Sequence, residues 1–168
     1  QLITILDGVI DNIMYQNPSQ KLNKNTLNLS DYYCLPGLID THTHITEKAG
    51  DTADLSIYFT MTNEEARRIS EKNALTTITA GFTSVRNVGS YIAWSARDLR
   101  DRINQGYVIG PRVQTAGFYL TVPGGGGDLL LPDYPEDKIP SYLREGVSKN
   151  VKEFRENAEK AVEGGADF

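Results

Sequence analysis

The sequence predicts an α/β fold in which an all-β segment precedes a series of alternating strands and helices. Two observations support this. Residues 1 to about 35 contain short apolar strand segments separated by turn residues. From Gly37 onward, short β-branched runs alternate with longer stretches whose apolar residues recur at helical spacing. Alternation of this kind is typical of parallel βα units. We therefore expect two domains, covering residues 1–35 and 36–168.

The first segment contains a clear hairpin signal. Asp7-Gly8 lies between the apolar pairs Ile5-Leu6 and Val9-Ile10. Both turn positions tolerate positive φ, as two-residue hairpin turns require. A loop signal follows at Asn17-Pro18-Ser19. An antiparallel hairpin and then a loop are predicted.

Three helices are predicted in the second segment. The first begins at Thr62, which has capping-box spacing to Glu65, and ends before Gly81. The second covers about residues 90–104 and the third about residues 147–163. Their inward-facing positions are expected to be Ala66, Ile69, Leu75 and Ile78 in the first, Ile92, Ala96, Leu99 and Ile103 in the second, and Val147, Val151, Phe154, Ala158 and Ala161 in the third. Short strands are expected over 83–88 and 112–116, with another starting at Ala166.

Composition excludes several classes of function. A formal net charge of −5 argues against a nucleic-acid partner, which would normally meet a basic face. No apolar run is long enough to span a membrane. The single cysteine, Cys34, cannot form an internal disulfide, and we expect it to be a small core residue.

The two histidines of the chain, His42 and His44, are separated by one residue. Side chains two residues apart project from the same face of a β-strand. Leu38-Ile39 just before them favours a buried strand. Because neutral imidazole is the commonest protein metal ligand and suits zinc, the pair is predicted to bind a metal.

Four motifs occur in a characteristic order. They are PGLIDTHTH at residues 36–44, AGFTSVRNVG at 80–89, GPRV at 110–113 followed by Ala116-Gly117, and GGADF at 164–168. Together they resemble the metal-dependent amidohydrolase superfamily over nearly the whole chain. The resemblance points to the prolidase-like or imidazolonepropionase-like subgroup, which includes peptidases that release a C-terminal arginine or lysine.

The resemblance implies a fold and a metal centre. Residues 1–35 would be part of a small β-sandwich, and residues 36–168 the first half of a (β/α)8 TIM-type barrel, ending at the start of its fourth strand. His42 and His44 would bind the more buried of two zinc ions. A carboxylated lysine two residues beyond Phe168 would bridge the two metals. Further histidines from strands five and six and an aspartate from strand eight would complete the site. We therefore expect the chain to be a piece of a longer polypeptide, with no catalytic residue of its own.

Arg86 is a candidate contact for the substrate at the end of the predicted second barrel strand. A buried arginine needs an anionic or carbonyl partner. It could form a structural ion pair between strands or bind a substrate carboxylate. The neighbouring Asn87 stands where the subgroup usually has an aspartate.

The loop after the predicted third barrel strand, residues 118–140, is unusually long and glycine-rich. Loops of this length are usually functional or mobile, so a specificity lid and a mobile spacer both remain open. Its candidate substrate contacts are Tyr119, Gly125, Gly126 and Asp128. Gly126 stands where related sequences often carry a histidine.

Three functions remain possible. The first is a metallopeptidase that uses metal-activated hydroxide to cleave dipeptides or short peptides, with a C-terminal Arg or Lys as one candidate specificity. An acidic Asp128 near the metals would favour it. The second is a cyclic amide hydrolase of the imidazolonepropionase type, and the third a non-catalytic scaffold. We expect a small peptide or amide substrate and a homo-oligomer, with the compartment open between cytoplasm and periplasm or secretion.

Overall fold

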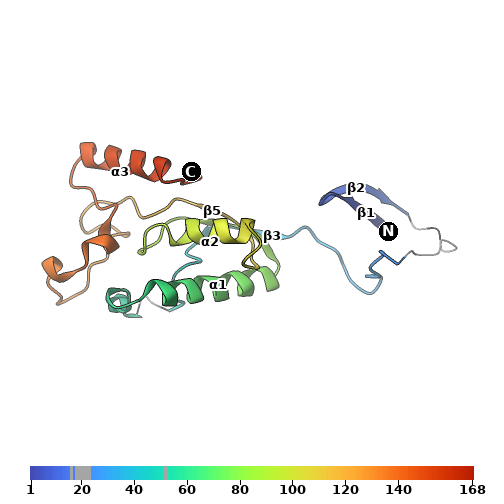
Figure 1. Cartoon of the computed structure of the whole chain (residues 1–168), viewed down its shortest axis with the longest axis horizontal. Coiled ribbons are helices and arrows are strands. Elements are labelled where there is room, and N and C mark those ends of the chain that lie inside the picture. The colour runs from blue at the N-terminus through green and yellow to red at the C-terminus, as the bar shows by residue number, and fades with distance from the viewer. Residues whose placement is uncertain (16, 18–23, 51–52) are drawn as a thin grey trace. The chain divides into compact units, whose positions relative to one another are not determined.

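A computed structural model describes residues 1–15, 17, 24–50 and 53–168. The predicted loop at Asn17-Pro18-Ser19 falls mostly outside these residues. The chain divides into two units, Gln1–Leu35 and Pro36–Phe168. Figure 1 traces the described elements of both. Within the described ranges, no helix combines the length and apolarity needed to cross a membrane.

The first unit contains the predicted hairpin. Strands β1 (Leu2–Leu6) and β2 (Val9–Met14) pair antiparallel. The turn residues Asp7 and Gly8 have φ of 50° and 78°, the positive values that a two-residue hairpin turn needs. The expectation that Cys34 is a core residue is wrong, because it is exposed in an irregular segment that follows the hairpin.

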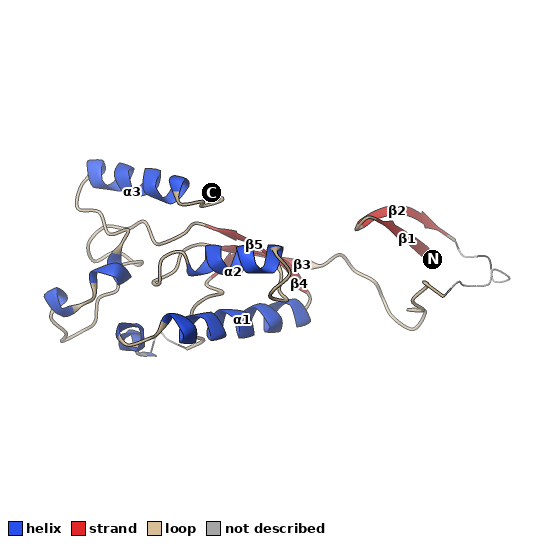
Figure 2. Cartoon of the chain, in the orientation of Figure 1, coloured by secondary structure: helices blue, strands red, loops and turns tan. Residues whose placement is uncertain are grey.

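The second unit is built on a parallel sheet of β3 (Leu38–Thr43), β4 (Phe82–Asn87) and β5 (Arg112–Thr115), in that order. Helices α1 (Asn63–Thr79) and α2 (Ser95–Asn104) connect these strands. Figure 2 shows both helices beside the sheet. The parallel βα order predicted from the sequence is therefore present.

The two faces of this sheet differ in burial. One face packs on α1 and α2 through a core cluster of Ile45, Ala74, Val85, Leu99 and Val113. At alternate positions of β4 and β5, Arg86, Arg112 and Gln114 are exposed and Ser84 is half-buried. Because strand side chains alternate, the apolar positions of each strand settle which face the helices cover.

The predicted start of α1 is confirmed. Thr62 Oγ1 accepts a hydrogen bond from the Glu65 backbone N–H at 3.2 Å, and Glu65 Oε2 accepts from the Thr62 N–H at 2.8 Å. The helix ends before Gly81, which has φ of 93°. One inward position is wrong: Leu75 is half exposed, and Ala74 is buried in its place.

Helix α2 begins at Ser95, five residues later than predicted. The residues before it make tertiary hydrogen bonds instead of helical ones. The Gly89 carbonyl faces His44 Nδ1, and the Tyr91 N–H donates to Glu47. The predicted inward positions Ala96 and Leu99 are buried.

Helix α3 (Val151–Glu163) also begins later than predicted. Asn150 caps it by accepting from the Glu153 N–H at 3.0 Å. Val147 lies outside the helix, because it pairs with Thr121 in an isolated parallel bridge. The prediction that Val151 and Phe154 face inward is wrong, since both are exposed, whereas Ala161 is buried.

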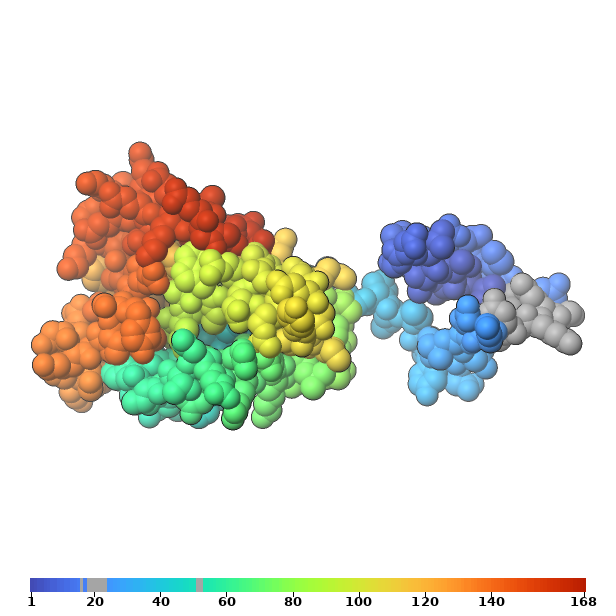
Figure 3. Space-filling view, viewed as in Figure 1, coloured from blue at the N-terminus to red at the C-terminus, as the bar shows by residue number. Residues whose placement is uncertain are grey.

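The long segment after β5 is packed against the rest of its unit. It contains two short 3-10 helices, η3 (Glu136–Lys138) and η4 (Ser141–Arg144). Its apolar residues form a second core with the 3-10 helix η2 (Leu55–Phe59). Figure 3 shows this orange segment against the teal residues near the start of α1. The buried members are Tyr58, Leu129, Ile139 and Leu143.

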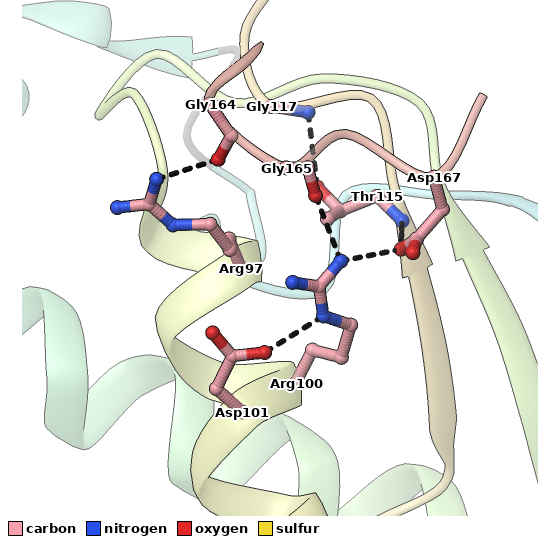
Figure 4. Close-up of polar contacts among 8 residues, drawn as sticks. All are labelled: Arg97, Arg100, Asp101, Thr115, Gly117, Gly164, Gly165 and Asp167. Atoms are coloured by element: carbon pink, nitrogen blue, oxygen red, sulfur yellow. Dashed lines mark hydrogen bonds and ion pairs between the residues drawn. The ribbon is translucent and has the colours of Figure 1, made fainter. Parts of the chain in front are cut away.

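The last residues of the chain lie beside β5. The Asp167 N–H donates to the Thr115 carbonyl at 2.7 Å, and the Thr115 N–H donates to Asp167 Oδ2 at 2.9 Å. Arg97 and Arg100 point from α2 to this segment, as Figure 4 shows. No strand is assigned at the predicted start, Ala166, but the pairing lies where that strand was expected.

Candidate functional site

His42 and His44 lie at the carboxyl end of β3. His42 is in the strand and exposed, while His44 follows it and is half-buried. Their rings meet edge to face with centroids 5.5 Å apart. Asp40 Oδ1 accepts from the His42 backbone N–H at 3.0 Å, which fixes the backbone just before the pair. The sequence spacing thus places both imidazoles together.

The ring of His44 is held on its Nδ1 side. Nδ1 lies 3.2 Å from the Gly89 carbonyl oxygen and 2.8 Å from the Tyr119 hydroxyl. A carbonyl oxygen can only accept, so this contact favours a hydrogen on Nδ1, and in the neutral ring Nε2 then keeps its lone pair. A metal ligand needs such a lone pair.

Asn87 fixes the carbonyl that faces His44. It is fully buried, and its Nδ2 donates to the Gly89 oxygen at 2.9 Å and to Ser90 Oγ at 3.1 Å. Its Oδ1 accepts from the Ile45 N–H at 2.8 Å. An aspartate at this position could accept from Ile45 but could not donate to Gly89, so the amide has a use that the sequence did not reveal.

Tyr119 reaches the site from the segment after β5. Its hydroxyl lies 3.0 Å from Glu47 Oε1 and also contacts His44. Burial, and then the Glu47 carboxylate, raise the pKa of Tyr119 above its usual range. The hydroxyl therefore stays protonated and donates to Glu47.

Glu47 is the residue that sequence reasoning missed. It lies on the turn after β3, where its N–H donates to the His44 carbonyl at 3.0 Å. Its Oε1 accepts from Tyr119 and from the Tyr91 N–H. Its position three residues after His44 could have identified it, because a single turn can bring such a residue back beside the histidine.

Arg86 donates from Nε to the Thr41 carbonyl at 2.8 Å, and its guanidinium lies over the Phe168 ring at 5.0 Å. None of the ion pairs found among the described residues includes Arg86. It links neighbouring strands as the structural alternative expected, but through a carbonyl and not through a carboxylate.

Asp128 anchors the glycine-rich loop internally. Its side chain is fully buried, and Arg144 binds both of its oxygens at 2.6 and 2.9 Å. Burial raises its pKa, but the hydrogen bonds from Arg144 and from the Gly124 N–H outweigh this and hold the pKa below its usual range. The carboxylate is thus occupied within the protein.

The two glycines predicted to contact substrate have different surroundings. A Cβ at Gly125 would lie 2.2 Å from Thr121 Oγ1, so this position is closed. A Cβ at Gly126 would meet nothing within 4 Å. Only Gly126 has room for a larger group.

The donor set fits part of a metal site. Two adjacent imidazoles, one with its Nε2 lone pair fixed, suit zinc. Among the described residues, however, no group of three or more His, Cys, Asp or Glu side chains is placed to hold a metal. Since zinc sites usually take about three protein ligands or more, His42 and His44 can supply two of the set.

Residues 33–168 match the model of the Amidohydrolase family. The chain therefore belongs to this family, as its motifs predicted. No curated protein matches it.

Solved structures of prolidase type are similar to this chain. One is the crystal structure of a Xaa-Pro dipeptidase with bound methionine in the active site, with 30% identity and a TM-score of 0.62, covering 79% of this chain and 32% of that chain. Another is a prolidase complexed with N-methylphosphonate-L-proline, with 29% identity and a TM-score of 0.59, covering 78% and 31%.

The A. niger ochratoxinase shares the fold, at 23% identity and a TM-score of 0.58, over 78% of this chain and 32% of that one. The chain spans about a third of the length of these structures.

Proposed function

We propose that this chain forms part of a zinc-dependent dipeptidase of the prolidase type, in which His42 and His44 bind one of two metal ions. The observation that carries the proposal is the pair of adjacent imidazoles, with His44 Nδ1 held by Gly89 so that Nε2 keeps its lone pair. A bound zinc ion would supply an activated water and polarise the scissile carbonyl. The chain's own contribution is to hold two ligands at the carboxyl end of a parallel strand, where active sites of such barrels lie.

The polar side chains on the exposed face of the sheet support the proposal that the sheet is part of a larger barrel. Polar and charged residues, including Ser84, Arg86, Arg112 and Gln114, alternate with the residues that α1 and α2 bury. In the proposed arrangement this face lines a (β/α)8 barrel, and residues 1–35 belong to a β-sandwich. The chain spans about a third of its solved relatives, so the remaining ligands, including a bridging carboxylated lysine, are proposed to come from other parts of the polypeptide.

The proposed substrates are Xaa-Pro dipeptides. The similar structures support this choice, since one is of a Xaa-Pro dipeptidase and another holds a proline phosphonate. A preference for C-terminal Arg or Lys is not part of the proposal. Asp128, the acidic residue offered in favour of a peptidase over a cyclic amide hydrolase, is buried against Arg144 and so does not distinguish the two. Gly126 remains the substrate-contact candidate with open surroundings.

Metal analysis of the purified protein tests the proposal, combined with hydrolysis of Xaa-Pro, Xaa-Arg and Xaa-Lys dipeptides. We expect bound zinc and Xaa-Pro cleavage, both reduced in His42→Ala. Gln105→Ala is the control, because Gln105 is an exposed residue that follows α2, away from the histidines.

The outcomes separate the alternatives. A protein that binds no metal and cleaves no dipeptide contradicts the proposal and supports a scaffold. Metal binding without dipeptide cleavage contradicts the dipeptidase and leaves the cyclic amide hydrolase. Cleavage of Xaa-Arg or Xaa-Lys alone would contradict the proline preference.

A further inference from the structure

The Tyr119 hydroxyl connects His44 to a carboxylate. It lies 2.8 Å from His44 Nδ1 and 3.0 Å from Glu47 Oε1. The ring of Tyr119 also packs at a tilt against that of Tyr91, with centroids 5.0 Å apart. Tyr119 therefore connects one nitrogen of His44 with a carboxylate that lies three residues further along the chain.

The direction of these hydrogen bonds is settled by their partners. The Glu47 carboxylate can only accept, so the Tyr119 O–H donates to it. The Tyr119 oxygen then accepts from His44 Nδ1–H, which it shares with the Gly89 carbonyl. Both acceptors require the hydrogen on Nδ1, so both favour the tautomer in which Nε2 can bind a metal.

Tyr119 is surrounded by glycines at positions where a Cβ would collide with it. A Cβ at Gly89 would lie 2.4 Å from Tyr119 Cδ1, and a Cβ at Gly127 would lie 2.6 Å from Tyr119 Cβ. A Cβ at Gly146 would meet the Tyr119 carbonyl oxygen. Glycines from three separate segments thus leave the room that the side chain and the backbone carbonyl of Tyr119 occupy.

We propose that Tyr119 and Glu47 are positioning residues that hold His44 with Nε2 directed to the metal. The inference rests on the proposed function, since it assumes that His44 is a ligand. The inference extends the proposed function, because Tyr119 acts by positioning His44 and not by contacting the substrate. Partners of this kind typically change metal affinity by about 10- to 100-fold when they are removed.

The test compares Tyr119→Phe with Glu47→Gln in the whole protein. Tyr119→Phe removes the hydroxyl and keeps the ring between the glycines. Glu47→Gln removes the charge and keeps an oxygen that can accept from Tyr119. The matched control is Tyr142→Phe, which deletes a hydroxyl whose hydrogen bond goes to the Tyr58 carbonyl at 3.4 Å and not to His44 or Glu47.

Zinc affinity is measured by competition with a chelator, and the visible spectrum of the cobalt-substituted protein reports ligand geometry. Thermal unfolding of the metal-free protein measures any structural effect. We expect Tyr119→Phe to weaken zinc binding about tenfold or more and to alter the cobalt spectrum. Glu47→Gln should have a smaller effect in the same direction, and Tyr142→Phe none.

Each other outcome overturns the proposal. If the wild-type protein binds no metal, the proposed function fails and the positioning role fails with it. If the wild type binds zinc and Tyr119→Phe binds it equally well, only the positioning role fails. If zinc binding falls only in proportion to the loss of metal-free stability, the residue is structural. Should Tyr119→Phe not fold, an unchanged zinc affinity in Glu47→Gln is the result that decides against the proposal.

Discussion

Two polar clusters involve the segment that follows β5, and they differ in what they leave available. Asp128 is fully buried, and its oxygens are bound by Arg144 and the Gly124 N–H. In the Tyr119–Glu47–His44 cluster, the hydrogen bonds that the described residues make to the imidazole involve only its Nδ1. The first cluster closes on itself, whereas the second leaves Nε2 of His44 without a hydrogen bond from the described residues, as the proposed metal site requires. Stability and metal affinity should therefore respond to different substitutions.

The largest loss of stability is expected for Arg144→Met. Removing the guanidinium leaves the Asp128 carboxylate buried without its partner. Breaking a buried pair in this way costs about 4 kcal/mol of unfolding free energy. Denaturant unfolding of the metal-free protein measures the loss, while zinc affinity should stay close to that of the wild type.

A matched control and a pH series sharpen this test. Arg68→Met removes an exposed ion pair with Glu64 and should cost about 0.5 kcal/mol or less. The pKa of Asp128 is lowered on folding, so the pair's stabilisation is complete above the ordinary Asp value of about 3.9. It is lost as the pH falls through the lowered folded pKa. Equal losses of unfolding free energy in Arg144→Met and Arg68→Met would contradict the expected difference between a buried and an exposed ion pair.

A smaller loss of stability, together with weaker zinc binding, is expected for Gly89→Ala. Gly89 has φ of 136°, and a Cβ there would lie 2.4 Å from Tyr119 Cδ1. Overpacking of this kind costs about 2 kcal/mol. The displaced Tyr119 ring should also disturb His44, which chelator competition would detect.

Gly106→Ala separates the clash from the backbone effect. Gly106 has φ of 79°, but a Cβ there would meet nothing within 4 Å. Its substitution should cost only the strain of a left-handed backbone, about 1 kcal/mol, and leave zinc binding unchanged. If both variants bind zinc like the wild type, the site is less dependent on Tyr119 than the geometry indicates.

The smallest effect is expected for Gly126→His. Its Cβ would enter open space, so the unfolding free energy should change by about 0.5 kcal/mol or less. The adjacent Gly127→His is the control, since its Cβ would lie 2.6 Å from Tyr119 Cβ. Thermal unfolding of the two variants should rank Gly127→His as clearly less stable, and the reverse order would contradict the loop geometry.

Features that depend only on neighbouring residues could be predicted from the sequence. The hairpin at Asp7-Gly8 and the capping box at Thr62 each need only a few consecutive residues, because their backbone geometry is local. The spacing of His42 and His44 likewise placed their rings together, since a strand repeats every second residue. The motifs also identified the family, and the match of the family model to residues 33–168 confirms it.

The tertiary structure alone decided which polar groups meet across the fold. Helix α2 starts late because residues before it bond across the fold: the Tyr91 N–H donates to Glu47 and the Trp94 N–H to the Gly117 carbonyl. Asp128 became an internal anchor only because Arg144 packs beside it. Tyr119 reaches His44 across 75 residues of sequence. Such pairings depend on the packing of whole elements, and local preference contains no information about them; this is why the sequence located the two histidines but not the residues that hold one of them.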